Sequence, residues 1–133
     1  MRDPLSQILG YQLRRVSSAA VNELTERLSD ENLSPSLAAV LLVVAANPGN
    51  TQAKLGRVLD IQRANIAPMV ARLEAIGALK RTSADGRSFE LECTPEGAAL
   101  AESLHGLIKD HEARFFEPLT GEEREQLGYL LGK

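Results

Sequence analysis

Residues 62–77 constrain the fold of this chain more than any other stretch, because they divide into two distinct helical faces. At about 100° per residue, the large apolar side chains gather on one side of a helix, which predicts that this side is buried. The apolar side comprises Ile66, Val70, Leu73 and Gly77, with Met69 and Ile76 at its margin. The opposite side comprises small or uncharged residues only, namely Ala64, Pro68, Ala71 and Ala75.

The slim outer side of this helix indicates what it can enter. The major groove of duplex DNA is about 12 Å wide, so it admits a helix whose inserted face is slim while polar side chains beside it reach bases and phosphates. Arg63, Asn65 and Arg72 lie on the flanks of the slim side. The pattern predicts a DNA-recognition helix, and the alternative is an ordinary solvated helix face.

A shorter helix is predicted immediately before this one, at residues 51–59. Thr51 is a suitable N-cap, and Asp60-Ile61-Gln62 turns the chain sharply after the helix. The residues expected to face inward are Leu55, Val58 and Leu59. Two short helices joined by a tight turn form a helix-turn-helix, in which the second helix presents its N-terminal residues to base edges.

A β-hairpin is predicted after Gly77, which suits the C-cap position of the helix. Asp85-Gly86 is a dipeptide that turns hairpins, and Arg87 therefore lies at or beside the hairpin tip. The flanking residues that fit roughly alternating strands are Leu79, Phe89, Leu91 and Cys93. An arginine at such a tip can enter a minor groove narrowed by A·T sequence, where the negative potential is deepest.

Residues 51–97 resemble the winged helix-turn-helix of the MarR family of bacterial transcriptional regulators. The resemblance rests on Thr-Gln-Ala-Lys-Leu at 51–55, Arg-Leu-Glu-Ala-Ile-Gly at 72–77, Asp-Gly-Arg-Ser at 85–88 and Leu-Glu-Cys-Thr-Pro-Glu-Gly at 91–97. The flanking helices also match the family in length. The resemblance implies a DNA-binding regulator whose wing arginine, Arg87, enters the minor groove and whose wing aspartate, Asp85, pairs with a nearby arginine such as Arg72.

The chain departs from the family pattern at three positions. Lys54 stands where the family usually has an acidic residue, and Gly86 replaces the first of two basic wing residues. Pro68 stands where many members have a polar residue facing DNA. A proline inside a helix removes one backbone hydrogen bond, at a cost of roughly 3 kcal/mol, so a bend is expected there.

Long amphipathic helices are predicted on both sides of this unit. One begins at Asp3-Pro4 and runs to about Ser29, and one runs from Thr94-Pro95 to about Phe116. A final helix opens with the capping box Thr120-Gly121-Glu122-Glu123 and carries Leu127, Leu130 and Leu131. Apolar stripes longer than the winged unit can cover favour the pairing of two chains.

These elements predict a mainly α fold with a small β-hairpin wing. We expect an N-terminal dimerisation helix at 1–33, a winged helix-turn-helix DNA-binding domain at 34–93 and C-terminal dimerisation helices at 94–133. The helix at 36–46 is apolar nearly all round, so it is expected to lie at the centre of the core.

The net charge of −3 argues at first against a nucleic-acid partner, but the charges are unevenly distributed. Residues 50–82 carry six basic and two acidic side chains, whereas residues 94–133 carry four basic and eight acidic ones. The basic centre fits contact with phosphates, and the acidic end fits solvent or a protein partner. One cysteine excludes an internal disulfide, and no apolar run is long enough to span a membrane, so a cytoplasmic protein is expected.

The candidate DNA contacts fall into two groups. Residues expected to contact bases are Gln62, Arg63, Ala64, Asn65, Ala67, Pro68 and Arg87. Residues expected to contact phosphates are Thr51, Lys54, Arg57, Arg72, Lys80 and Arg81. Arginine matches guanine and asparagine matches adenine, whereas phosphate contacts position the protein without selecting sequence. For each phosphate candidate, simple solvation is the alternative, and Gln62 can equally serve only as a helix cap.

Other candidate sites are weaker. Similar proteins bind small anionic aromatic compounds between the helical dimer region and the winged domain, and Tyr11, Arg14 and Arg15 offer stacking and charge for such a ligand. The alternative is that each of them is an ordinary surface or interface residue. His111 falls on an apolar stripe, where it is either a pH switch or simply a satisfied interface residue. Cys93 is expected to be a buried structural thiol, because a redox sensor needs exposure and a lowered pKa.

The sequence therefore predicts a homodimeric transcriptional regulator, most simply a repressor, that binds a pseudo-palindromic operator in double-stranded DNA and responds to a small molecule. The alternative is a winged helix used only for contact with other proteins. An enzyme is not expected, and no metal or cofactor is implied, because the histidines, the cysteine and the carboxylates show no metal spacing, phosphate loop or nucleophile motif.

Overall fold

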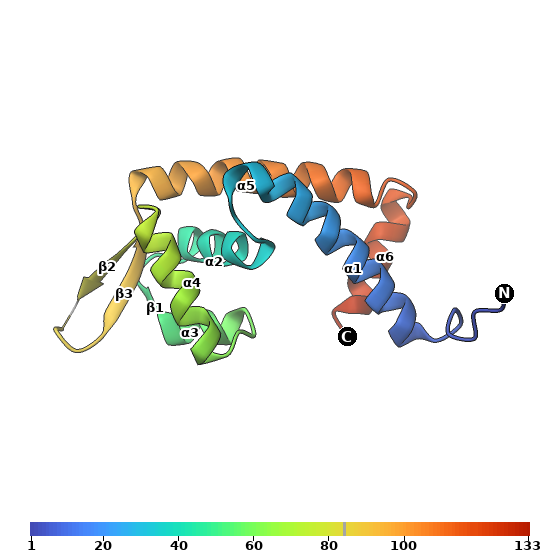
Figure 1. Ribbon diagram of the computed structural model, residues 1–133, viewed down its shortest axis with the longest axis horizontal. Helices are drawn as coiled ribbons and strands as arrows, with labels where there is room; N and C mark the ends of the chain where they lie inside the picture. Colours follow the sequence, from blue (N-terminus) through green and yellow to red (C-terminus); the bar gives the residue numbers. More distant parts are fainter. Residues whose placement is uncertain (84) are drawn as a thin grey trace.

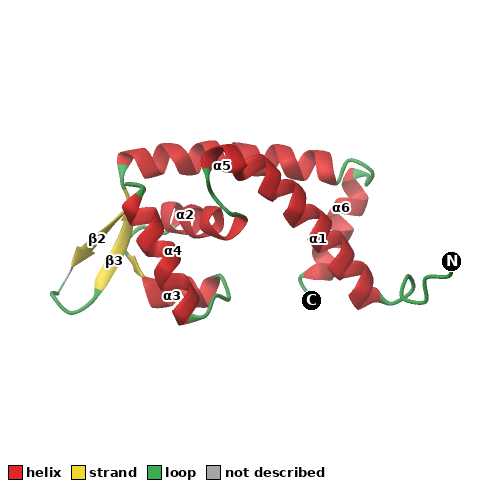
Figure 2. Cartoon of the chain, in the orientation of Figure 1, coloured by secondary structure: helices red, strands yellow, loops and turns green. Residues whose placement is uncertain are grey.

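The computed structural model describes residues 1–83 and 85–133, and Figure 1 shows a mainly helical chain with a small sheet at one end. The elements are α1 (Leu9–Leu28), a 3-10 turn η1 (Ser29–Glu31), α2 (Pro35–Ala46), β1 (Asn50–Thr51), α3 (Gln52–Val58), α4 (Arg63–Ala75), β2 (Leu79–Ser83), β3 (Phe89–Cys93), α5 (Pro95–Phe115) and α6 (Gly121–Leu131). The predicted fold class is confirmed, as Figure 2 shows by secondary structure.

Side-chain caps fix where the helices begin. The hydroxyls of Ser34, Thr51, Thr94 and Thr120 each accept a hydrogen bond from a backbone N–H in the first turn of the helix that follows. At Thr120 the Glu123 side chain completes the predicted capping box. These caps satisfy donors that the helices themselves leave unpaired.

The wing is part of a three-stranded antiparallel sheet in the order β1-β3-β2. Leu79 pairs with Cys93 at its base and Ser83 pairs with Phe89 at its outer end. Strand β1 was not predicted, because two residues carry no alternating pattern; Asn50 pairs with Leu91 there. In the predicted turn, Ala84 lies outside the described residues.

Helix α2 lies at the centre of the core, as its apolar composition predicted. It packs against α1, α4, α5 and β3. The buried apolar residues are Leu28, Leu33, Leu37, Ala38, Val40, Leu41, Val44, Leu55, Ile66, Val70, Leu73, Ala78, Leu79, Leu91, Ala101 and Leu104. Full burial of each of the larger side chains contributes about 1.5–3 kcal/mol, so this one cluster holds the winged unit and both long helices together.

The prediction that the first helix begins at Asp3-Pro4 is wrong, because α1 begins at Leu9. Asp3 instead accepts a hydrogen bond from the backbone N–H of Leu5, within a separate turn. Leu5 and Ile8 are 41% and 50% exposed, so no packing within the chain supports helix in these residues. Short helical segments without tertiary packing are marginal in water.

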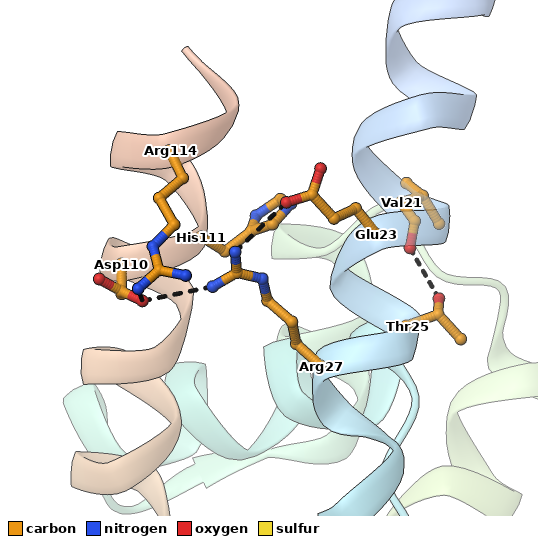
Figure 3. Close-up of polar contacts among 7 residues, drawn as sticks. All are labelled: Val21, Glu23, Thr25, Arg27, Asp110, His111 and Arg114. Atoms are coloured by element: carbon orange, nitrogen blue, oxygen red, sulfur yellow. Dashed lines mark hydrogen bonds and ion pairs between the residues drawn. The ribbon is translucent and has the colours of Figure 1, made fainter. Parts of the chain in front are cut away.

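Helices α1 and α5 are also joined by a polar cluster, which Figure 3 shows. Arg27 of α1 lies 3.4 Å from Glu23 and 3.3 Å from Asp110 of α5. The predicted position of His111 on an inward face is confirmed, since its side chain is 8% exposed. Its Nε2 lies 4.0 Å from a Glu23 oxygen and has no hydrogen-bond partner among the described residues.

The outer parts of α1 and α6 lie at the end of the molecule away from the wing, where both chain termini also lie (Figure 1). Several large apolar residues along these two helices are about half exposed or more: Leu9, Leu13, Val16, Val21, Tyr129, Leu130 and Leu131. The exposed Leu130 and Leu131 belong to the apolar stripe that the sequence predicts to extend beyond what the winged unit can cover. Across residues 1–83 and 85–133, no single helix is both long and apolar enough to cross a membrane.

Candidate nucleic-acid interface

Helix α4 divides into the two faces that its sequence predicts. Ile66, Val70 and Leu73 are at most 1% exposed, so they anchor the helix in the core. The opposite residues, Ala64, Pro68, Ala71 and Ala75, are all exposed. Ile76 was predicted at the margin of the buried side but is 53% exposed. It is the C-cap residue, so the helical period no longer determines which way its side chain faces. The slim outer face is thus free to approach another molecule.

The turn between α3 and α4 fixes the direction of the second helix. The backbone N–H of Ile61 donates to the carbonyl of Gly56 over 2.8 Å, and a Cβ on Gly56 would lie only 3.0 Å from the Ile61 carbonyl oxygen. Asp60 adopts a left-handed conformation with φ of 53°. Val58 was expected to face inward but is 72% exposed. Leu55 and Leu59, one helical turn apart, face the core as predicted.

The N-terminal end of α4 presents polar side chains that are free to bind a partner. Gln62 is the N-cap residue, but its side chain forms no capping hydrogen bond. Gln62, Arg63 and Asn65 are exposed. Gln62, Arg63 and Arg57 of α3 line one open hollow of about 550 Å³ between the two helices. Gln52 and Asp60 also line this hollow. The sequence did not predict either residue there, because the direction of their side chains depends on the geometry of the turn between the two helices.

Pro68 lies inside α4, five residues after its start, and the helix is continuous through it. Because proline has no backbone N–H, the carbonyl of Ala64 lacks its usual intrahelical donor. Both residues are exposed, whereas the neighbouring Ala67, also expected to contact bases, is half-buried. Pro68 and Ala64 are therefore better placed than Ala67 to touch a base.

The wing tip is held by a carboxylate. Asp85 accepts hydrogen bonds from the backbone N–H groups of Arg87 at 3.0 Å and Ser88 at 3.2 Å. These two bonds lower the pKa of Asp85 below its ordinary value. Gly86 has φ of 75°, which suits glycine in this tight turn. Arg87 is exposed at the tip of the hairpin, as predicted.

Arg72 does not pair with Asp85, contrary to the partner suggested by the sequence. Its guanidinium donates to the backbone carbonyl of Asn32 over 3.1 Å, in the connection between α1 and α2. Asn32 is in the left-handed conformation at φ of 55°. Arg72 therefore ties the last turn of α4 to the end of the long N-terminal helix.

The remaining basic residues differ in how freely their charges are available. Lys54 and Arg57 are exposed and form no ion pair within residues 1–83 and 85–133. Lys80 lies 3.7 Å from Glu92, and Arg81 lies 2.6 Å from Glu74 of α4. The hydroxyl of Thr51 is engaged in capping α3. Free positive charge therefore gathers on α3 and the start of α4 rather than on β2.

A second hollow lies on α1, outside the helix-turn-helix. Tyr11, Arg15 and Phe115 help to line it, and its volume is about 340 Å³. The guanidinium carbon of Arg15 lies 6.0 Å from the centre of the Tyr11 ring. Arg14 is exposed on the same helix but does not line the hollow. Two of the three residues suggested for ligand binding thus lie together.

Cys93 is half-buried at the end of β3, and burial raises the pKa of its thiol. Reactive cysteines need the opposite shift, because the thiolate is the reactive form. Within the ranges 1–83 and 85–133, no three His, Cys, Asp or Glu side chains gather in a way that could hold a metal ion.

Known proteins similar to this chain are transcriptional regulators. No protein-family model matches the chain. A Thauera aromatica protein named as the transcriptional regulatory protein for the hcr operon is 31% identical over 127 residues, covering 93% of this chain and 75% of that protein. The HTH-type transcriptional repressor Rv2887 of Mycobacterium tuberculosis is 28% identical, over 94% of this chain and 91% of its own length.

Solved structures agree with these relatives. The repressor CouR bound to a 23-mer DNA duplex matches with a TM-score of 0.90 and 32% identity, over 96% of this chain and 92% of that chain. CouR bound to p-coumaroyl-CoA matches with a TM-score of 0.89 and 30% identity, over 99% and 94%. The MarR family protein Rv2887 in complex with salicylic acid matches with a TM-score of 0.76 and 27% identity, over 93% of each. The shared fold, the identity over nearly the whole length and the exposed α4 beside its wing show that this chain belongs to the MarR family of winged helix-turn-helix transcriptional regulators.

Proposed function

We propose that this chain is a homodimeric transcriptional repressor that binds a pseudo-palindromic operator in double-stranded DNA. The observation that carries the proposal is the exposed slim face of α4, with Gln62, Arg63 and Asn65 unengaged at its N-terminal end. Its relative CouR was solved bound to a DNA duplex, which supports the same use of the fold here.

The proposed roles follow from position. Arg63, Asn65 and Gln62 contact base edges in the major groove, and Arg87 enters the adjacent minor groove from the wing tip. Lys54 and Arg57, whose charges are unpaired among the described residues, contact phosphates beside the major groove that α4 enters. Arg72, Lys80 and Arg81 already have partners in this chain. Their main proposed role is to support α4 and the wing, and contact with phosphates is their secondary role.

Dimerisation is assigned to the two ends of the chain, residues 1–33 and 94–133. The half-exposed apolar residues of α1 and α6 lie at the same end of the molecule, away from the wing. Covering them with a second copy removes apolar surface from water and places two α4 helices about a two-fold axis. The two helices must then meet successive major grooves, about 34 Å apart.

A small molecule is proposed to modulate operator binding. Rv2887 was solved with salicylic acid and CouR with p-coumaroyl-CoA. In this chain the α1 hollow, lined by Tyr11 and Arg15, offers an aromatic ring and a cation to an anionic aromatic compound. A ligand bound beside α1 affects DNA binding only insofar as it prefers one spacing of the paired α4 helices over another.

The test uses duplexes selected by the wild-type protein from a random-sequence library, with affinity measured by fluorescence anisotropy. Combined Arg63→Ala and Arg87→Ala substitutions are expected to weaken binding roughly 30-fold or more, because each base contact is worth about 1–3 kcal/mol. The matched control, Arg2→Ala with Lys109→Ala, removes the same charge from exposed residues that form no ion pair among the described residues; it is expected to change affinity less than threefold, and light scattering verifies that both double variants have the same oligomeric state as the wild-type protein.

Two outcomes would contradict the proposal. Equal loss in the double variant and its control would mean that Arg63 and Arg87 contribute only general charge. Failure of the wild-type protein to select any duplex, at low salt, would favour the alternative of a winged helix that contacts only proteins, because DNA binding through phosphates strengthens as salt is lowered.

A further inference from the structure

Pro68 is an unusual residue for its position. It lies in the interior of α4, where proline is about 3 kcal/mol less favourable than alanine, and it is exposed rather than packed in the core. Neither helix stability nor core packing within this chain accounts for it. Its ring instead projects from the outer face, one helical turn beyond Ala64 and less than one turn before Ala71.

The chemistry of this face limits what it can recognise. The side chains of Pro68, Ala64 and Ala71 have no hydrogen-bond donor or acceptor, so they cannot distinguish the polar edges of base pairs. Among the groups that base pairs expose in the major groove, the C5-methyl group of thymine is the largest apolar one. A rigid pyrrolidine ring offers apolar contact area there without losing side-chain entropy on binding.

We propose that Pro68 is a specificity-determining residue that selects thymine, by packing its ring against a C5-methyl group in each half-site. This inference rests on the proposed insertion of α4 into the major groove. Arg63 and Asn65, at the N-terminal end of the helix, then recognise neighbouring bases through hydrogen bonds. Pro68 adds selection at a position where no hydrogen bond is formed.

Replacing thymine by uracil tests the contact, because uracil lacks only the C5-methyl group and keeps the same hydrogen-bonding edge. Each thymine in a half-site of a duplex selected by the wild-type chain is replaced singly. One position, or two adjacent ones, is expected to lose about fourfold in affinity, as burial of one methyl-sized apolar group predicts. In Pro68→Ala this uracil penalty is expected to fall below twofold.

The control variant is Arg57→Ala, which removes a proposed phosphate contact. It is expected to lower affinity for the thymine and uracil duplexes equally and so to keep the fourfold ratio. Pro68→Ala exchanges proline for the best helix former, and an unchanged or increased helical circular dichroism signal verifies that the variant is folded.

Equal binding of thymine and uracil duplexes at every half-site position would overturn the role of Pro68 and leave DNA binding itself established. A uracil penalty of the same size in wild type and Pro68→Ala would assign the methyl contact to another residue and also overturn it. If no duplex is selected at all, the proposed function fails together with this inference.

Discussion

Individual arginines of the winged unit differ in whether another group in the chain already binds them. Arg63 and Arg87 are exposed and available, as predicted. Arg72 and Arg81 carry the same charge but are bound to Asn32 and Glu74. These partners lie 40 and 7 residues away along the chain, so no local pattern could have indicated them.

Asp85 provides a residue-scale prediction about pH. Because hydrogen bonds from Arg87 and Ser88 lower its pKa in the folded state, the charged carboxylate is favoured by folding. The stabilisation of the wing tip is therefore fully present above the ordinary pKa of an aspartate. It is lost as the pH falls through the lowered value. The amide signals of Arg87 and Ser88 in NMR spectra are expected to titrate together at that lower pH.

Removing the carboxylate tests its role at neutral pH. Asp85→Ala is expected to abolish this titration and to weaken operator binding severalfold, because Arg87 is then held less firmly at the wing tip. Asp30→Ala, at an exposed position of η1, is the matched control and is expected to leave both measurements unchanged. Unchanged operator affinity in Asp85→Ala would remove Asp85 from the support of the wing.

At the scale of elements, helical period and capping residues predicted most of the architecture. The faces of α4, the caps of four helices and the hairpin all follow from short-range pattern. The errors fall where tertiary packing decides. The residues predicted to form the first turns of α1 have no packing partner within the chain. Val58, predicted to face inward, is the last residue of α3 and is exposed. The two-residue strand β1 is defined by its pairing with β3.

Gly97 provides an element-scale prediction about how α5 joins the wing. A Cβ on Gly97 would lie 1.8 Å from the carbonyl oxygen of Ala78, a backbone atom that cannot move aside. Gly97→Ala is therefore expected to lower the free energy of unfolding in urea by about 3 kcal/mol. It does so by forcing the start of α5 away from the base of β2.

The matched control is Gly106→Ala in the same helix, where an added Cβ meets no heavy atom within 4 Å. This substitution is expected to raise the free energy of unfolding by roughly 0.5–1 kcal/mol, because alanine loses less backbone entropy in a helix. Similar effects of the two substitutions would show that the contact between Gly97 and Ala78 is not tight in solution.

At the scale of the whole molecule, the charge distribution and the exposed apolar ends agree with a two-fold assembly on DNA. Lys54, Arg57 and Arg63, basic and unpaired among the described residues, lie on α3 and α4, and eight of the 18 acidic residues lie in the last 40 positions. The sequence predicted both features. The sequence could not predict the spacing of the two recognition helices in the dimer, because that distance depends on how α1 and α6 of the two copies pair.

The central claim is that paired α4 helices occupy two successive major grooves of one operator. Dimethyl sulfate methylates guanine N7 in the major groove, so its footprint on a selected duplex locates the inserted helices directly. Two protected clusters centred about 10 base pairs apart on one face of the duplex are expected, and both are expected to be lost when Arg63→Ala and Arg87→Ala are combined. A single protected cluster, or tight binding with no protection of major-groove guanines within the bound site, would contradict it.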